Sequence, residues 1–255
     1  MHYKSLFVSD IHLGTPQCRV EFLLQFMHDN TFDNIFLIGD IVDIWAHKHW
    51  KWNINHNTFI QKILRESRKG TNVVYIPGNH DEAIREVFKD NPIAFFGDIK
   101  IVNEYSYDSV CGLKLLLMHG DEFDGAIRNF GWLYSIGDRA YALALWLNTL
   151  FNKCRKLCGL RYWSLSAYLK SKVKEAVQVV NNFEELVTRK CIMNGFDGVV
   201  FGHIHTASIK VIKTKLIMND GDMCESMTCI VETTEGIFQL RKLTDDTILA
   251  SYNKG

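Results

Sequence analysis

Short aliphatic runs recur along the chain, and the first five end at blocks of polar residues. The runs occupy residues 3–8, 34–38, 72–76, 114–118 and 198–201. Short apolar runs bounded by Gly, Asp or Asn are typical of strands buried on both faces. Between the first three runs, apolar residues recur with helical spacing, as in Phe22, Leu23, Phe26 and Met27. This alternation of strands and helices predicts a layered α/β fold.

The pattern changes after His205 to short alternating runs. Residues 209–212, 216–218, 227–231 and 237–240 read as strands, and Thr234-Glu235-Gly236 reads as a turn. We expect these strands to form a second sheet packed on the first, which gives a two-sheet sandwich flanked by helices.

The polar blocks that follow the first five runs contain metal-ligand chemistry. They are Ser9-Asp10-Ile11-His12, Gly39-Asp40, Gly78-Asn79-His80-Asp81, His119-Gly120-Asp121 and Gly202-His203-Ile204-His205. Carboxylate, amide and imidazole groups together are the ligands that first-row divalent metals use, and sites in α/β folds lie beyond the carboxyl ends of strands. A lone Asp is more often a helix cap and a lone His a structural residue. Five blocks in this position therefore favour a metal centre, to which His2, His28, His47, His49 and His56 are not assigned.

The ordered set of blocks resembles the calcineurin-like metallophosphoesterase superfamily over roughly residues 3 to 240. The resemblance implies a four-layer α/β/β/α sandwich and two divalent metal ions, Mn²⁺ first, with Fe²⁺ or Zn²⁺ as alternatives. It implies one metal held by Asp10, His12 and His205 and another held by Asn79, His119 and His203. Asp40 would bridge the two, at the separation of about 3.5–4 Å that suits an in-line phosphoryl displacement.

Two further residues of the third block receive catalytic roles from the same resemblance. His80 would stabilise the phosphoryl oxygens or protonate the leaving oxygen. Asp81 could orient the His80 imidazole or cap the following helix.

A finer resemblance is to the UDP-2,3-diacylglucosamine diphosphatases of lipid A synthesis. It rests on Gly39–Trp45, on the helical insertion after His119 and on Asn219–Asp222. It implies hydrolysis of UDP-2,3-diacylglucosamine to UMP and 2,3-diacylglucosamine 1-phosphate. The chain has His80 where the best-known branch of that family has Arg, and it also lacks that branch's ending after Gly202-His203. The alternatives are therefore a phosphodiesterase or phosphatase of another nucleotide or phospholipid, and a non-catalytic scaffold, although known scaffolds of this fold have usually lost ligands.

Length and hydropathy favour one domain with an insertion. The 255 residues, of which 47% are hydrophobic, suffice for a single phosphoesterase domain over 1–255. The segment from about 124 to 180 is first apolar and then basic, and we expect it to form a helical lid. It could receive acyl chains or lie on an anionic membrane, with Arg161, Lys170 and Lys172 as hypothetical substrate-binding cations. The ordinary alternative is an apolar core stripe beside a solvated basic face.

Charge and cysteine content narrow the partners and the compartment. Lys plus Arg equals Asp plus Glu at 29 each, so we expect no nucleic-acid partner. The partner expected instead is a UDP-linked acylated sugar or a related phosphoester. Seven scattered cysteines indicate reduced thiols, and a strand that begins at Tyr3 leaves no room for a signal peptide. We therefore expect a cytoplasmic protein that can contact the inner membrane peripherally.

Overall fold

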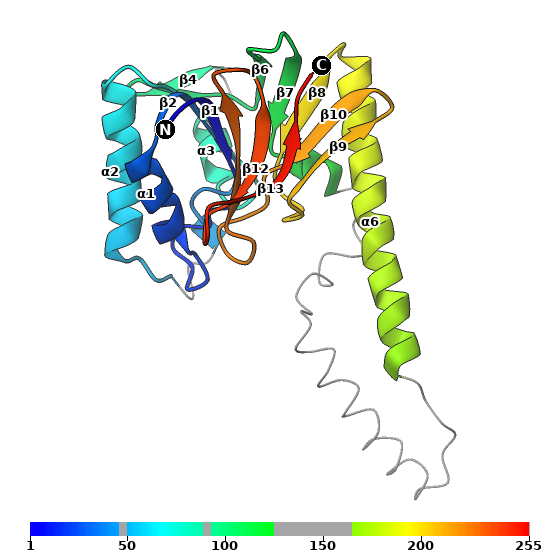
Figure 1. The fold of residues 1–255 in the computed structure, drawn as a ribbon. Helices are drawn as coiled ribbons and strands as arrows, with labels where there is room; N and C mark the ends of the chain where they lie inside the picture. The colour runs from blue at the N-terminus through cyan, green and yellow to red at the C-terminus, as the bar shows by residue number, and fades with distance from the viewer. Residues whose placement is uncertain (46–49, 89–92, 125–164, 255) are drawn as a thin grey trace, which may run out of the picture. The chain divides into compact units, whose positions relative to one another are not determined.

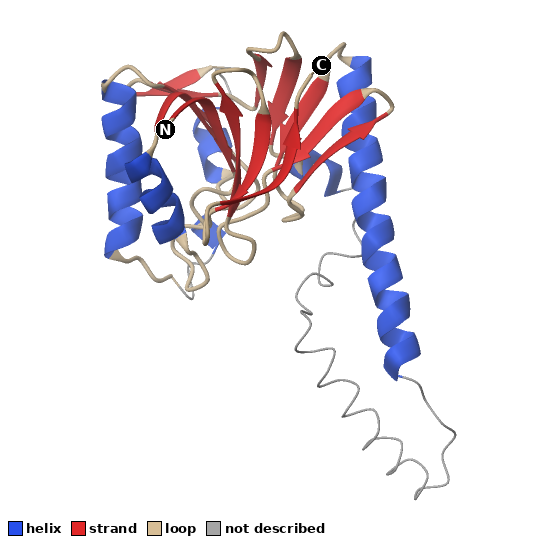
Figure 2. Cartoon of the chain, viewed as in Figure 1, coloured by secondary structure: helices blue, strands red, loops and turns tan. Residues whose placement is uncertain are grey.

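The computed structural model describes residues 1–45, 50–88, 93–124 and 165–254, with the backbone alone for 87–88 and 165–176. Its chain divides into two compact units, Met1–Asp121 with Val187–Gly255, and Glu122–Leu186. All five polar blocks lie in the first unit, which contains both β-sheets (Figures 1 and 2). The second unit contains most of the long helix α6 (Leu165–Met193).

The first sheet has eight strands in the order β13-β12-β11-β1-β2-β3-β5-β4. Its parallel part consists of β1 (His2–Val8), β2 (Thr31–Ile38), β3 (Asn72–Ile76) and β5 (Ile99–Ile101). β4 (Ala94–Phe96) pairs antiparallel with β5 at one edge. On the other side of β1, three antiparallel strands extend the sheet: β11 (Thr228–Thr233), β12 (Phe238–Lys242) and β13 (Thr247–Tyr252).

The second sheet has five strands in the order β6-β7-β8-β10-β9. β7 (Lys114–Met118), β8 (Gly198–Phe201) and β10 (Lys215–Asn219) are parallel, whereas β6 (Glu104–Asp108) and β9 (Ser208–Ile212) pair antiparallel at the edges. The sequence-based assignment of all strands after His205 to the second sheet is therefore wrong. β9 and β10 do join that sheet, but β11 and β12 extend the first sheet beside β1. The second sheet also includes β7 and β8, which precede His205 in the sequence.

Helices cover one face of the first sheet. They are α1 (Val20–Asp29), α2 (Ile54–Arg68) and the short α3 (Ala83–Phe88), and a 3₁₀ turn, η2, spans Asp121–Phe123. The side chain of Asn53 accepts hydrogen bonds from the N–H groups of Asn55 and His56, which caps α2. Phe26 of α1 and Phe59 of α2 are buried in one apolar cluster with β1 and β2.

Alternate residues of β1 face two different apolar layers. Leu6 and Val8 belong to the cluster shared with α1 and α2, whereas Phe7 belongs to the cluster between the sheets. Phe7 stacks on Phe36 of β2, with ring centroids 5.0 Å apart. Strands buried on both faces explain the continuous apolar runs of the sequence, and the expected α/β sandwich with two sheets and helices is confirmed. Among the described helices, none is long and apolar enough to cross a membrane.

Candidate metal centre

The five polar blocks meet because each follows the carboxyl end of a parallel strand. Asp10, Asp40 and Asn79 follow β1, β2 and β3 of the first sheet, whereas His119 and His203 follow β7 and β8 of the second. The rings of His119 and His203 lie 5.1 Å apart. The site is thus built by both sheets of the first unit, at one common end of their parallel strands.

Five of the seven predicted ligands have a left-handed backbone. The φ angles are 48° at Asp10, 52° at His12, 54° at Asp40, 67° at His203 and 50° at His205. This region costs an L-residue roughly 1–3 kcal/mol and persists only where surrounding contacts hold it. Here the N–H of Asp10 donates to the Gly39 carbonyl (3.0 Å) and that of His12 to the Asp40 carbonyl (2.9 Å). Such strain gathers at functional sites, and it turns these side chains towards one centre.

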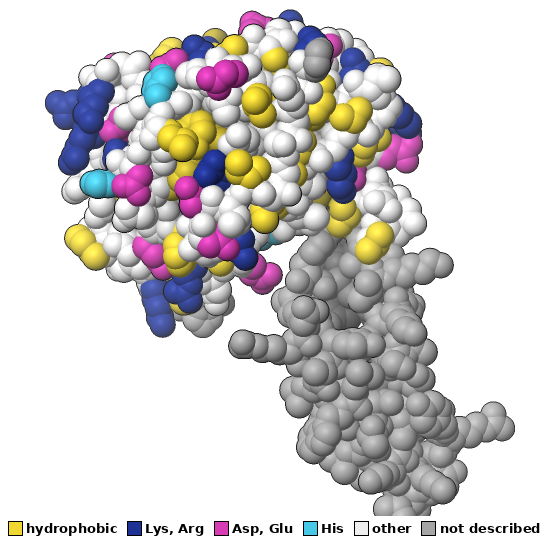
Figure 3. Space-filling view, in the orientation of Figure 1, with side chains coloured by type: hydrophobic (Ala, Val, Ile, Leu, Met, Phe, Trp, Pro, Cys, Tyr) yellow, Lys and Arg dark blue, Asp and Glu magenta, His cyan; other side chains and the backbone are white. Residues whose placement is uncertain are grey.

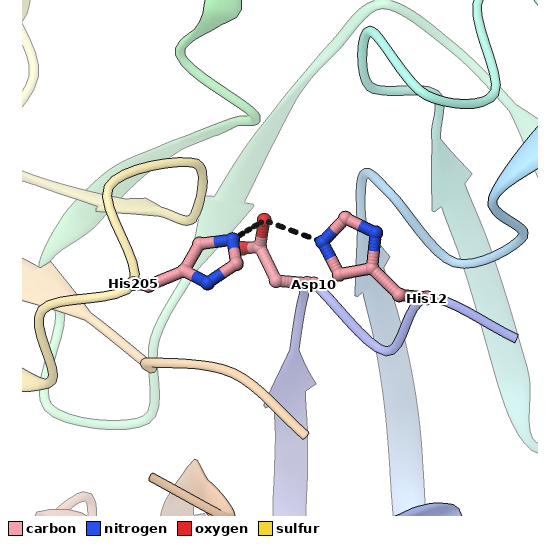
Figure 4. Close-up of side chains that lie close together, drawn as sticks. All are labelled: Asp10, His12 and His205. Atoms are coloured by element: carbon pink, nitrogen blue, oxygen red, sulfur yellow. Dashed lines mark ion pairs between the residues drawn. The ribbon is translucent and has the colours of Figure 1, made fainter. Parts of the chain in front are cut away.

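The first cluster contains Asp10, His12 and His205 (Figure 4). Asp10 Oδ1 lies 3.1 Å from His205 Nε2 and 3.9 Å from His12 Nε2. Asp10 Oδ2 instead accepts hydrogen bonds from Ser9 Oγ (2.5 Å) and the His203 N–H (2.9 Å). Among the described residues, Asp10 Oδ1 and His12 Nε2 are buried without a hydrogen-bond partner. Such atoms suit the coordination of a cation, so these residues fit one metal ion.

The second cluster contains Asp40, His119 and His203, with Asn79 beside it. His119 Nε2 lies 3.4 Å from Asp40 Oδ2 and 3.3 Å from Asn79 Oδ1. His119 Nδ1 lies 3.0 Å from the Ile38 carbonyl oxygen, which can accept only a proton carried by that nitrogen. This contact leaves Nε2 for the centre and is typical of metal-ligating histidines.

Asp40 belongs to two of the three His and Asp clusters. Its Oδ1 accepts the backbone N–H of His80 (2.8 Å), whereas Oδ2 faces the imidazoles of His119, His80 (3.9 Å) and His12 (4.0 Å). An anchored carboxylate with one oxygen between two ligand groups suits a bridging position.

Glycines make room for these side chains. Gly39 has φ +82°, and a Cβ there would lie 2.2 Å from His119 Nδ1. A Cβ at Gly78 would lie 2.2 Å from Asp40 Oδ1. The glycines of the two blocks therefore permit the close approach of β2, β3 and β7 at the centre.

The electrostatics of the centre favour positive charge. Burial raises the pKa of Asp10, but the adjacent imidazole of His205 outweighs this and leaves the pKa well below its usual range. Burial alone would lower the pKa of His119, but the Asp40 and Asp10 carboxylates raise it to about 10. Likewise Asp10 raises the pKa of His205 to about 9 against its burial. Buried carboxylates that hold cationic imidazoles in this way form a site that can exchange those protons for metal ions.

Asp43 is a site residue that the sequence interpretation missed. Its carboxylate oxygens lie 3.3 Å from His12 Nδ1 and 3.1 Å from His80 Nδ1. Asp43 is almost fully buried, whereas the His80 side chain is 30% exposed. The Trp45 ring lies 5.0 Å from the His80 ring. The partly exposed His80 imidazole therefore lies between the buried Asp43 carboxylate and the Trp45 ring.

Asp81 does not make the expected contact with the His80 imidazole. Its carboxylate accepts hydrogen bonds from the N–H groups of Ile41 (2.9 Å) and Gly78 (2.5 Å) and from the Tyr75 hydroxyl. It is fully buried and holds together the turns that follow β2 and β3. Both backbone donors lie in these turns and not in α3, so the Asp81 side chain does not act as the cap of the following helix.

Arg85 was also missed, and it connects two ligand-bearing turns. Its guanidinium group binds Asp121 in a bidentate manner (2.5 and 2.9 Å) and also donates to the Pro77 carbonyl. Pro77 lies two residues before Asn79, and Asp121 lies two residues after His119. Arg85 of α3 therefore fixes the positions of two predicted ligands relative to each other.

The structure does not describe the side chains of the three hypothetical substrate-binding cations. Arg161 is outside the described residues, as are the side chains of Lys170 and Lys172. Their roles, like the individual ligand assignments, stay predictions.

Comparison with known proteins identifies the family. A model of the calcineurin-like phosphoesterase family matches residues 3–207. The chain belongs to this family. Its membership and its His and Asp clusters make it a metal-dependent phosphoesterase. No curated protein matches the chain.

Solved structures share the fold of this calcineurin-like phosphoesterase at low identity. YfcE, a phosphoesterase from E. coli, is 13% identical with a TM-score of 0.52, over 97% of each chain. Vacuolar Protein Sorting 29 from Cryptosporidium parvum is 11% identical with a TM-score of 0.51, over 98% of this chain and 97% of the other. These likenesses establish the fold alone.

Proposed function

We propose that this calcineurin-like phosphoesterase hydrolyses the diphosphate of UDP-2,3-diacylglucosamine to UMP and 2,3-diacylglucosamine 1-phosphate. The observation that carries the phosphoesterase part is the position of Asp40, whose Oδ2 lies between the His119 imidazole and those of His12 and His80. Two divalent ions, when bound, polarise phosphoryl oxygens and lower the pKa of an attacking water. Mn²⁺ is the ion that we propose first, with Fe²⁺ or Zn²⁺ as alternatives.

The residues around the clusters supply the rest of the mechanism. Asp10, His12 and His205 would hold one ion, and Asn79, His119 and His203 the other. His80 contacts the centre through Nε2, and its Nδ1 faces Asp43. In its protonated form it can donate to a non-bridging phosphate oxygen or to the leaving oxygen, because its side chain is partly open to solvent.

Apolar surface beside the centre supports an acylated substrate. Trp45 is 54% exposed next to His80. A cavity of about 250 Å³ with apolar walls lies in the apolar layer between α2 and the first sheet, where its lining includes Phe59, Ile63 and Ile99. The motif Gly39–Trp45 and the insertion after His119 resemble the lipid A diphosphatases. A soluble nucleotide would leave the apolar insertion of the sequence without a clear purpose.

The proposed partners and location follow from the same substrate. On the face that Figure 3 shows, basic and acidic side chains are interspersed, which supports a partner other than nucleic acid. We propose a single phosphoesterase domain over 1–255 in which about 124–180 acts as a lid. A cytoplasmic enzyme of this kind would meet its substrate at the inner membrane by peripheral contact.

The deciding experiment is an assay of Mn²⁺-loaded protein with UDP-2,3-diacylglucosamine in detergent. A metal-free sample is the control, and bis-(p-nitrophenyl) phosphate is assayed in parallel. Metal-dependent release of UMP is the expected result. Hydrolysis of the small diester alone would keep the metal chemistry and replace the substrate by another nucleotide or phospholipid. A protein inert towards both in every metal-loaded state would instead be a scaffold.

A further inference from the structure

Beneath Asp10, the hydroxyl of Ser9 lies between two buried carboxyl groups. Ser9 Oγ is 2.5 Å from Asp10 Oδ2 and 2.8 Å from Asp220 Oδ1. All three residues are fully buried. A serine hydroxyl carries one hydrogen, so it can donate to only one of the two groups.

The second contact therefore needs a hydrogen from a carboxyl group. Asp10 binds that proton less readily than Asp220, because two contacts stabilise its ionised form. Its Oδ2 also accepts the His203 N–H (2.9 Å), and its Oδ1 faces His205 Nε2. The short contact from Ser9 to Asp10 is typical of a hydroxyl that donates to an ionised carboxylate. The hydrogen count then places the remaining proton on Asp220, which donates to Ser9.

The second oxygen of Asp220 agrees with a neutral acid. Among the described residues, Asp220 Oδ2 is buried without a hydrogen-bond partner. An ionised carboxylate would leave a charged oxygen without a donor, which costs far more than a bare carbonyl of a neutral acid. Burial, with the nearby charge of Asp10, raises the pKa of Asp220 to about 8.

We propose that Asp220 is a neutral carboxylic acid that positions Asp10 through Ser9. The proposal rests on the proposed function, in which Asp10 is a metal ligand. The chain of hydrogen bonds holds Asp10 Oδ2 and leaves Oδ1 for the metal, as outer-shell partners do. The loop of Asp220 is itself anchored, since Asn219 Nδ2 donates to the Gly202 carbonyl (2.8 Å) and Thr228 Oγ1 to the Asp220 carbonyl (2.7 Å).

Two substitutions of Asp220 test whether its side chain is a neutral hydrogen-bond donor or an ionised acceptor. Asp220→Asn places an N–H donor where the acid O–H would be, so it should keep the hydrogen bond to Ser9. Asp220→Ala removes the group. Glu232→Gln is the control, because Glu232 is an equally buried acid on β11 whose contacts are Tyr107, Ser5 and Val110.

Calorimetric titration with Mn²⁺ and circular dichroism on the full chain give the readout. Substitution of outer-shell partners typically lowers metal affinity by about 10–100-fold. Asp220→Ala should therefore lower the Mn²⁺ affinity by about 10–100-fold, whereas Asp220→Asn should keep it within about threefold of wild type. Glu232→Gln should bind Mn²⁺ like wild type. The proposal is overturned if Asp220→Asn is as weak as Asp220→Ala, or if Asp220→Ala binds like wild type.

Infrared spectroscopy provides a measurement that does not depend on metal binding or activity. The wild type should show a carbonyl band of a protonated carboxylic acid that Asp220→Asn lacks and that Glu235→Gln, a change at an exposed acid, retains. Glu232→Gln can remove only the separate contribution of Glu232. Absence of that band from the wild type would contradict the neutral acid. If the wild type bound no metal at all, the proposed function would fail, while the band would still decide the protonation of Asp220.

Discussion

The carboxylate of Asp43 lies 3.1 Å from Nδ1 of His80, on the side of the ring opposite the metal clusters. The same carboxylate lies 3.3 Å from Nδ1 of His12. A carboxylate in this position favours the tautomer with the proton on Nδ1, so that Nε2 of His12 is free for a metal ion.

We expect Asp43→Asn to lower phosphoesterase activity by about 10–100-fold while the protein stays folded. An amide offers one acceptor and one donor to two Nδ1 atoms, so it fits the required tautomer at only one of the two rings. Steady-state hydrolysis of bis-(p-nitrophenyl) phosphate with Mn²⁺ tests this. The control is Asp33→Asn, an acid on β2 that pairs with Lys4 at the surface. Wild-type kcat in Asp43→Asn would show that Asp43 is not needed to orient these rings.

Two glycines with positive φ angles separate the cost of a strained backbone from the cost of a steric clash. Gly39 and Gly70 have φ angles of +82° and +101°, but a Cβ at Gly70 would meet nothing within 4 Å. Gly70→Ala should cost about 1–2 kcal/mol of stability from left-handed strain alone. Gly39→Ala should cost more, because its Cβ would displace His119.

The measurement is the shift in Tm on addition of Mn²⁺. Wild type and Gly70→Ala should both be stabilised by the ion, whereas Gly39→Ala should not. A normal Mn²⁺ response in Gly39→Ala would mean that His119 can move without loss of the site.

The sequence predicted the strands and their polar ends well because both depend on local patterns. The apolar runs before Asp10, Asp40, Asn79, His119 and His203 are strands, and side chains that follow parallel strands must meet at one edge. The membership of the sheets was predicted poorly. β11 pairs antiparallel with β1, with Phe7 opposite Ile230, and a short apolar run of this kind would fit beside a strand of either sheet.

The supporting residues could not be predicted for a related reason. Asp43 and Asp81 both lie within three residues of a predicted ligand, but their contacts depend on the path of each turn. Asp81 faces the backbone of Gly78 and Ile41, and Asp43 takes the place beside His80. Arg85 reaches Asp121 across 36 residues of sequence, a contact that no periodicity indicates.

For Mn²⁺ affinity, the bidentate geometry of the Arg85 guanidinium group should matter more than its charge. Arg85→Lys keeps the charge but loses the bidentate contact with Asp121 and the simultaneous contact with Pro77. Because this contact joins the turns of Asn79 and His119, we expect Mn²⁺ affinity to fall about tenfold. Calorimetric titration measures this, with Arg68→Lys on the exposed face of α2 as the control. Equal affinities in the two variants would contradict a positioning role for Arg85.

Glu232, which is not one of the predicted metal ligands, should make the free energy of unfolding depend on pH. It is fully buried between the sheets, where it accepts hydrogen bonds from the Tyr107 hydroxyl and the Val110 N–H (2.7 Å). Burial raises its pKa above the usual range, although Tyr107 and Val110 partly oppose this. The folded protein therefore holds the proton more tightly than the unfolded chain does. Its contribution to stability is present below the unfolded pKa and is lost as pH rises through the folded pKa.

Denaturant unfolding of wild type and Glu232→Gln at several pH values between 4 and 8 tests this prediction. Glutamine does not titrate, so the stability of wild type relative to Glu232→Gln should fall as pH rises across that interval. Glu235→Gln is the control, because Glu235 lies in an exposed turn and its pKa is lowered by the Thr233 and Thr234 hydroxyls. The stability of wild type relative to Glu235→Gln should therefore rise slightly as pH rises. A difference between wild type and Glu232→Gln that stayed constant with pH would show that the pKa of Glu232 is the same in the folded and unfolded protein.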